Sequence, residues 1–206
     1  MSIPTHTHRF IVGTGAARRP LVLLHGSHGN ESDLMALAAE LAPGAARLGI
    51  RGTVDMNPGH AFFHRRPDRS VDEADLATRA PKLAEFIATA CASYGIANQP
   101  VAVGFSNGAI MAAALLMTQP DLLAGAILFR PLLPFSSEPQ YRLDGTPVLI
   151  VDGAKDTRRS PGDGLQLARQ LRHAGAAVTY HLLPVGHAVT AEDSAIGSGW
   201  LQVLDL

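Results

Sequence analysis

A serine lies between two glycines in the run Gly104-Phe105-Ser106-Asn107-Gly108, which directly follows the apolar residues 101–103. An alanine-rich segment that favours a helix follows at 109–117. A strand that turns sharply into a helix holds such a serine in a strained backbone conformation, with glycines where side chains would collide. The spacing predicts a nucleophile elbow, with Ser106 exposed at the C-terminal edge of a sheet. A nucleotide-binding turn is the alternative, but neither GxGxxG nor a Walker lysine occurs here.

A serine hydroxyl is a weak nucleophile that needs a base and a group to orient that base. The predicted base is His187, which follows Gly186 in a loop after a strand. A lone histidine is more often structural, but its position after the serine and the acid favours catalysis. The predicted acid is Asp156, beyond the turn at Gly153. Asp152 ends the strand itself and is the competing candidate, with bracing of the turn as its other role.

Backbone N–H groups must stabilise the negative charge that develops on the attacked carbonyl oxygen. We assign one to Asn107, the residue after the nucleophile, and the other to Ser27, in a glycine-containing loop after the apolar residues 20–24. Histidines near these positions could be interpreted as metal ligands: His25, His28, His60 and His64. Because no third ligand has the spacing of a metal motif, we expect neither a metal nor another cofactor.

The elements that must position these groups alternate along the chain. Strands are predicted at 8–12, 21–24, 47–51, 101–105, 124–129, 148–151 and 178–182. Helices are predicted at 31–41, 72–94, 107–119, 162–174 and 191–204. This alternation predicts an α/β fold with a mostly parallel sheet and helices on both faces. Two irregular segments, 52–70 and 130–146, follow strands at the edge that carries the serine, where loops select the substrate.

The composition is that of one compact enzyme domain over residues 1–206. With 47% hydrophobic and only 17% charged residues, the chain can bury a substantial core. A formal net charge of −1 offers no field for nucleic acid. Cys91, the single cysteine, cannot form an intramolecular disulfide and is assigned to packing. Because no long apolar stretch or signal-peptide core occurs, we expect a cytoplasmic protein without stable membrane association. The sequence leaves a homodimer open.

Four motifs together resemble the phospholipase/carboxylesterase branch of the α/β-hydrolases: LLHGSHGNESDL, GFSNGAIMAAALL, DGAKDT and GHAVT. That branch includes acyl-protein thioesterases and small bacterial carboxylesterases. The stretch that begins at Arg51, with AFFHRR at 61–66, is similar to a bacterial subgroup described as hydroquinone-associated carboxylesterases or dienelactone-hydrolase-like proteins. The resemblance covers nearly the whole chain.

The resemblance implies an α/β-hydrolase fold and a site in which each matching residue keeps the family role. The implied residues are Ser106 as nucleophile, Asp156 as acid, His187 as base, and Ser27 and Asn107 as oxyanion donors. The acid motif departs from the family pattern, which continues as DP with apolar residues and a proline, because this chain reads DTRRSP at 156–161. The loop that holds the acid is therefore expected to differ in shape.

The loops at this edge are expected to determine the substrate. Apolar side chains that could line a pocket for an acyl or aromatic group are Phe62, Phe63, Leu132, Leu133 and Phe135. Because the chain is too short for a separate lid domain, we expect little or no lid and small ester substrates rather than triglyceride droplets.

Arg130 ends the strand predicted at 124–129, where relatives of the acyl-protein thioesterase kind tend to carry a small polar residue. At the edge of the active site its planar guanidinium would suit a substrate carboxylate, with Arg65 or Arg66 as a second contact. The competing interpretation is a salt bridge to a loop acid such as Glu138 or Asp144.

The sequence therefore predicts a serine hydrolase that cleaves small carboxylic esters or thioesters through an acyl-enzyme. A dienelactone-type lactonase or a cofactor-free perhydrolase could use the same triad. A small-molecule sensor that retains the triad is a further alternative, because a fold does not dictate a function. Turnover separates these classes, since a sensor would release hardly any product.

Overall fold

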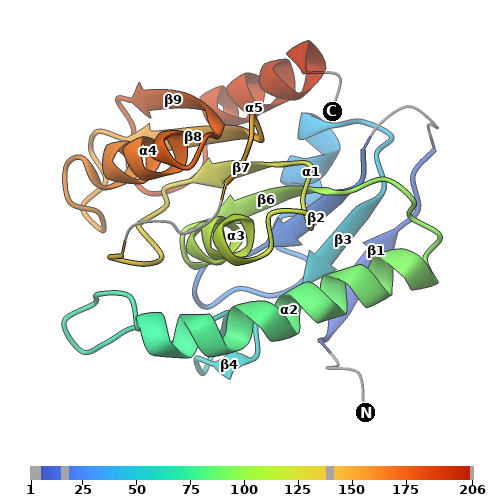
Figure 1. Cartoon of the computed structure of the whole chain (residues 1–206), viewed down its shortest axis with the longest axis horizontal. Helices are drawn as coiled ribbons and strands as arrows, with labels where there is room; N and C mark the ends of the chain where they lie inside the picture. The colour runs from blue at the N-terminus through green and yellow to red at the C-terminus, as the bar shows by residue number, and fades with distance from the viewer. Residues whose placement is uncertain (1–5, 15–18, 138–141, 205–206) are drawn as a thin grey trace.

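The computed structural model describes residues 6–14, 19–137 and 142–204 of the chain. A seven-stranded sheet runs through it in the order β1-β3-β2-β6-β7-β8-β9 (Figure 1). β1 pairs antiparallel with β3, and every other pairing in this sheet is parallel. The predicted α/β fold with a mostly parallel sheet is therefore confirmed. The strands of this sheet are β1 (His8–Ile11), β2 (Leu21–Leu24), β3 (Arg47–Ile50), β6 (Val101–Phe105), β7 (Gly125–Phe129), β8 (Pro147–Gly153) and β9 (Ala177–Leu183).

The central strands form because both of their faces are buried. Successive side chains of a strand point to opposite faces of a sheet. In β2, Val22 and Leu24 pack into one hydrophobic cluster, whereas Leu21 and Leu23 pack into another on the other face. A strand of this kind consists of nearly continuous apolar residues, which explains why its position could be predicted from the sequence.

Helices cover both faces of the sheet, as predicted. α2 (Glu73–Ser93), α3 (Asn107–Thr118) and α4 (Asp163–His173) pack on one face (Figure 1). α1 (Met35–Leu41) and α5 (Ala191–Val203) pack on the other (Figure 1).

Side chains cap the starts of two helices, α2 and α5. The Asp72 side chain accepts a hydrogen bond from the Asp75 N–H and caps α2. A reciprocal capping box of Thr190 and Asp193 begins α5. α1 begins only at Met35, four residues later than predicted, because the residues before it form turns.

The segment 52–70, predicted to be irregular, contains a short antiparallel hairpin of β4 (Val54–Asp55) and β5 (His60–Ala61). Two-residue strands leave no alternating pattern long enough to detect in a sequence. Cys91 is buried in the cluster around α2, in agreement with its predicted packing role. Within the described ranges, none of the helices has the length and apolar character needed to cross a membrane.

Candidate active site

Ser106 occupies a strained turn between β6 and α3. Its backbone has φ 54° and ψ −110°, a conformation that costs a residue with a side chain on the order of 1–3 kcal/mol. The Ser106 N–H donates to the carbonyl of Phe129 on β7, at 2.9 Å, which ties the turn to the neighbouring strand. A Cβ on Gly104 would lie 2.6 Å from the Ala109 Cα, and one on Gly108 would overlap the Leu24 carbonyl. The two glycines therefore allow strand and helix to approach, as the sequence predicted.

Three side chains predicted to act together lie in one hydrogen-bonded row. The Ser106 Oγ is 3.0 Å from His187 Nε2, and His187 Nδ1 is 2.7 Å from Asp156 Oδ2. Because an ionised carboxylate only accepts hydrogen bonds, Nδ1 carries the proton and Nε2 presents its lone pair to the serine hydroxyl. The other oxygen of Asp156 accepts the Arg158 N–H at 2.8 Å, which fixes the carboxylate on its loop.

The electrostatic environment favours a neutral His187. Burial lowers the pKa of His187 below its ordinary value of about 6.5, and its bond to Asp156 opposes that change. The positive charges of Arg159 and Arg158 lower this pKa further. His187 is therefore in the form that accepts a proton at neutral pH.

Asp152, the competing candidate for the acid, does not contact His187. Its carboxylate accepts a hydrogen bond from the Tyr180 hydroxyl at 3.2 Å, and Asp156 instead contacts His187. Burial raises the pKa of Asp152 to about 6, and its contacts with Tyr180 and the charge of Arg130 only partly offset this. Asp152 therefore belongs to the packing between β8 and β9.

The two backbone groups assigned to the oxyanion lie at the same edge. Asn107 begins α3, and the first bond of that helix runs from the Ile110 N–H to the Ser106 carbonyl, so the Asn107 N–H precedes the helical ladder. Ser27 lines the same cavity as Ser106. A Cβ on Gly26 would lie 2.9 Å from the Phe105 ring, so a larger residue there would force this ring beside the nucleophile turn to shift.

The Asn107 side chain also has a structural role, which the sequence did not reveal. Its Oδ1 accepts the Phe62 N–H at 2.7 Å, and its Nδ2 donates to the Phe63 carbonyl at 3.3 Å. These bonds hold the segment after β5 against the start of α3. The two phenylalanines are almost completely buried, 2% and 1% exposed.

A cavity of about 660 Å³ opens over Ser106 and His187. Leu132 lines it, as predicted, together with Phe105 and Met56. The prediction that Phe63 contacts substrate is wrong, because its side chain is buried in the core and does not line this cavity. Leu133 and Phe135 pack against the same core rather than lining the cavity.

Arg130 does not contact the cavity either, and its prediction as a substrate-binding residue is wrong. Its side chain is completely buried and forms a two-pronged ion pair with Asp193, with both N–O distances at 2.8 Å. It also donates to backbone carbonyls, among them those of Val151 at 2.9 Å and Gly186 at 3.1 Å.

The competing interpretation of Arg130 as a salt-bridge residue was right in kind and wrong in partner. Asp144 pairs with Arg142 at the surface, and Glu138 lies outside the described residues. The actual partner, Asp193, is 63 residues away in the chain, so no local signal identified it. The Arg130 side chain supports the loop that carries His187.

Arg159 is the site residue that the sequence analysis missed. Its Nη2 donates to the Ser106 Oγ at 3.0 Å, and its Nε donates to the Arg130 carbonyl at 2.8 Å. Burial lowers the pKa of Arg159 to about 10, with the nearby charge of Arg65 adding to this, so it stays protonated at neutral pH. Its only sequence signal was the departure of the acid motif at 156–161 from the family pattern.

Three of the four histidines weighed as metal ligands make other contacts, whereas His60 Nδ1 is buried and has no hydrogen-bond partner in the part of the chain that the structure describes. His25 Nδ1 lies 2.6 Å from the Gly26 carbonyl, and His25 Nε2 accepts the Gly52 N–H at 3.0 Å. His28 contacts the Pro58 carbonyl, and His64 pairs with an aspartate. Among the residues that the structure describes, no group of three or more His, Cys, Asp or Glu side chains could hold a metal ion.

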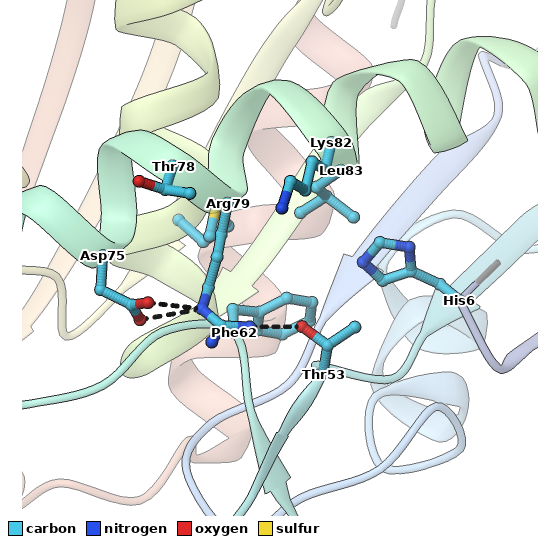
Figure 2. A pocket seen from close by; sticks show the side chains of 9 residues that line it. His6, Thr53, Phe62, Asp75, Thr78, Arg79, Lys82 and Leu83 are labelled. Carbon is cyan, nitrogen blue, oxygen red and sulfur yellow. Dashed lines mark hydrogen bonds and ion pairs between the residues drawn. The ribbon is translucent and has the colours of Figure 1, made fainter. Parts of the chain in front are cut away.

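A second cavity, of about 320 Å³, lies beside α2, and Ser106, Asp156 and His187 do not line it (Figure 2). Figure 2 shows Arg79 reaching from α2 toward Thr53, where it donates at 2.8 Å, and both oxygens of Asp75 accept from its Nε. These contacts join α2 to the segment before β4 and give the arginine a structural role.

Comparison with known proteins gives a consistent result. The family model described as Phospholipase/Carboxylesterase matches residues 6–193. MhqD of Bacillus subtilis (strain 168), named as a hydrolase, is 35% identical over 195 residues, which cover 94% of this chain and 98% of that protein. The crystal structure of a Bacillus cereus carboxylesterase is 35% identical with a TM-score of 0.90, covering 96% of this chain and 94% of that one. A Mesorhizobium loti carboxylesterase is 29% identical, with the same TM-score and coverage.

Proposed function

The chain belongs to the phospholipase/carboxylesterase family of α/β-hydrolases and is a carboxylesterase-type hydrolase, and we propose that it cleaves small carboxylic esters and thioesters through a Ser106-His187-Asp156 triad. The observation that carries this proposal is the unbroken row of hydrogen bonds from the Ser106 Oγ through the His187 ring to the Asp156 carboxylate.

The reaction begins when the Ser106 Oγ attacks the carbonyl carbon of the substrate and His187 Nε2 takes its proton. The carbonyl oxygen becomes an oxyanion, to which the backbone N–H groups of Asn107 and Ser27 donate. Asp156 orients the ring through Nδ1 and stabilises the imidazolium. The protonated His187 then gives its proton to the leaving alcohol or thiol, and an acyl group remains on the serine oxygen.

Water completes the cycle. His187, neutral again, removes a proton from a water molecule as the water oxygen attacks the acyl carbon. The second tetrahedral intermediate collapses, the Ser106 Oγ receives a proton from the imidazolium, and the carboxylic acid leaves. No group beyond those of the chain, the substrate and water is needed to balance these steps.

The strained turn at Ser106 and the burial of Asp156 support the assignment of these roles. A positive φ at a residue with a Cβ persists only when its surroundings determine it, and such residues cluster at functional sites. The side chain of Asp156 is 1% exposed, so its negative charge acts on His187 with little screening by solvent.

A panel of matched acyl esters and thioesters of short to medium chain length tests the proposal. We expect steady turnover of both, and we expect Ser106→Ala to lower kcat by up to about 10⁶ without a change of fold. A single turnover followed by a stable covalent adduct would instead identify a sensor. Turnover of esters alone would restrict the proposal to oxygen esters.

A further inference from the structure

The cavity over Ser106 carries an excess of positive charge in a chain whose formal net charge is −1. Four arginines line it against two aspartates: Arg65, Arg69, Arg158, Arg159, Asp68 and Asp163. Low-dielectric walls lined by one sign of charge concentrate a field, which attracts substrates of the opposite sign.

The two aspartates form no direct ion pair with Arg65 or Arg159, although the charge of Asp163 acts on both arginines. Asp68 accepts hydrogen bonds from the Ser70 hydroxyl and N–H, and Asp163 accepts the Ser160 N–H at 2.7 Å. Within residues 6–14, 19–137 and 142–204, neither Arg65 nor Arg159 forms an ion pair with a carboxylate.

Arg159 has donors to spare at the reaction centre. A guanidinium carries five N–H groups, and Arg159 uses one each on the Arg130 carbonyl, the Arg158 carbonyl and the Ser106 Oγ. In the described part of the chain, two of its N–H groups are therefore available to a bound anion.

Arg65 is a second cationic side chain at this cavity whose hydrogen-bond donors are not all satisfied. Its Nη1 is buried and has no hydrogen-bond partner in the part of the chain that the structure describes. Burial lowers its pKa, and the charge of Arg69 adds to this change. A buried donor without a partner is costly, and Arg65 lines the cavity, so an acceptor that reached its Nη1 would relieve that cost.

From this arrangement we propose that the preferred substrate bears a carboxylate a few bonds from the scissile ester or thioester carbonyl, and that Arg159 and Arg65 bind it. The inference rests on the proposed function, because it places the carboxylate relative to an acyl group on Ser106. The planar fork of a guanidinium matches the two oxygens of a carboxylate.

The position of Arg159 determines how far the substrate carboxylate lies from the scissile carbonyl. The attacked carbonyl carbon must approach the Ser106 Oγ to about 3–3.5 Å. Since Arg159 Nη2 is itself 3.0 Å from that oxygen, a carboxylate bound to Arg159 lies next to the reacting carbonyl. A half-ester of a short dicarboxylic acid has this geometry, and Leu132 and Phe105 can contact its methylene groups.

Hydrolysis of monomethyl glutarate and methyl pentanoate compares an anionic ester with a neutral ester of similar length. We expect the wild type to favour the half-ester in kcat/KM. Arg159→Gln and Arg65→Gln should each reduce kcat/KM for the half-ester by roughly tenfold to a hundredfold more than for the neutral ester. The control variant Arg169→Gln removes the same charge from an exposed position of α4 outside this cavity. It should leave kcat/KM unchanged for both the half-ester and the neutral ester.

A labelling experiment separates this inference from the proposed function. Glutarate should slow the reaction of Ser106 with a fluorophosphonate in the wild type, uncharged pentanamide should not, and Arg65→Gln should remove the protection. Labelling that never reaches Ser106 would overturn the proposed function itself. Labelling at Ser106 without protection by glutarate, or equal losses for the two esters in both variants, would overturn the inference alone.

Discussion

Asp152 and Asp156 differ in their environments although only three residues separate them. Asp156 accepts a hydrogen bond from His187 Nδ1, whereas Asp152 accepts one from the Tyr180 hydroxyl and has its pKa raised to about 6 by burial. A carboxylate that is partly neutral near pH 6 is a poor partner for an imidazolium. The position of each oxygen therefore supports Asp156 rather than Asp152 as the acid of the proposed triad.

Substitution of each aspartate by asparagine tests this assignment. Asp156→Asn should reduce kcat by roughly 10⁴, because the histidine loses the anion that fixes its tautomer. Asp152→Asn should reduce kcat by less than about tenfold, because it changes a contact outside the triad. Steady-state kinetics on one ester, with circular dichroism to verify folding, provides the measurement. The opposite order of the two effects would make Asp152 the acid.

The pH dependence of the reaction follows from the same site. Attack needs neutral His187, and burial together with Arg159 and Arg158 lowers the pKa of this histidine. The value of kcat/KM should therefore rise with pH through an apparent pKa below about 6.5 and stay level above it. Arg159→Gln removes a positive charge, so it should move this pKa upward. A wild-type midpoint well above 6.5 would disagree with this account.

At the scale of elements, the buried pair of Arg130 and Asp193 joins the end of β7 to the start of α5. Asp193 also closes the capping box with Thr190. Arg130 additionally donates to the carbonyls of Gly186 and Ala188, on either side of His187. The ion pair therefore fixes the loop that carries His187 through backbone contacts on both sides of this residue.

Removal of one partner should leave a buried charge without compensation. We expect Arg130→Met to lower the free energy of unfolding by about 3–5 kcal/mol, and we expect Asp193→Asn added to it to recover part of that loss. Urea unfolding followed by fluorescence measures both. Arg142→Gln breaks an exposed pair and should cost less than about 1 kcal/mol. If Arg130→Met costs no more than this control, the pair does not hold the loop.

The turn from β6 to α3 depends on close approach of backbones. A Cβ on Gly108 would overlap the carbonyls of Leu24 and His25, so Gly108→Ala should destabilise the fold by about 3 kcal/mol and displace Ser106. Gly199→Ala, in α5 with open space around it, should be neutral or stabilising, because alanine favours a helix. Thermal unfolding compares the two variants. Equal melting temperatures for the two variants would contradict this prediction, because they would show that the backbone around Gly108 can move to accommodate a Cβ.

At the scale of the whole molecule, the sequence predicted the framework well because the framework is made of buried regular elements. The central strands β2, β6, β7 and β8 consist mostly of buried apolar residues, whereas β1 and β9 contain polar residues and are partly exposed. β8 and β9 also extend beyond their predicted bounds. Ser106, Asp156 and His187 each follow a strand of the sheet. The sequence could not show where a side chain at a strand end points. Arg130 turns inward to a partner 63 residues away, and Arg159 turns toward Ser106 from a loop without a recognisable pattern.

The most direct test of the central claim is the site at which a fluorophosphonate reacts. Intact-mass measurement and peptide mapping should show one adduct per chain, on Ser106, with loss of ester hydrolysis in proportion to labelling. The Ser106→Ala variant should take up no label while remaining folded. An adduct on another serine, or full hydrolysis by the labelled protein, would contradict the triad proposed here.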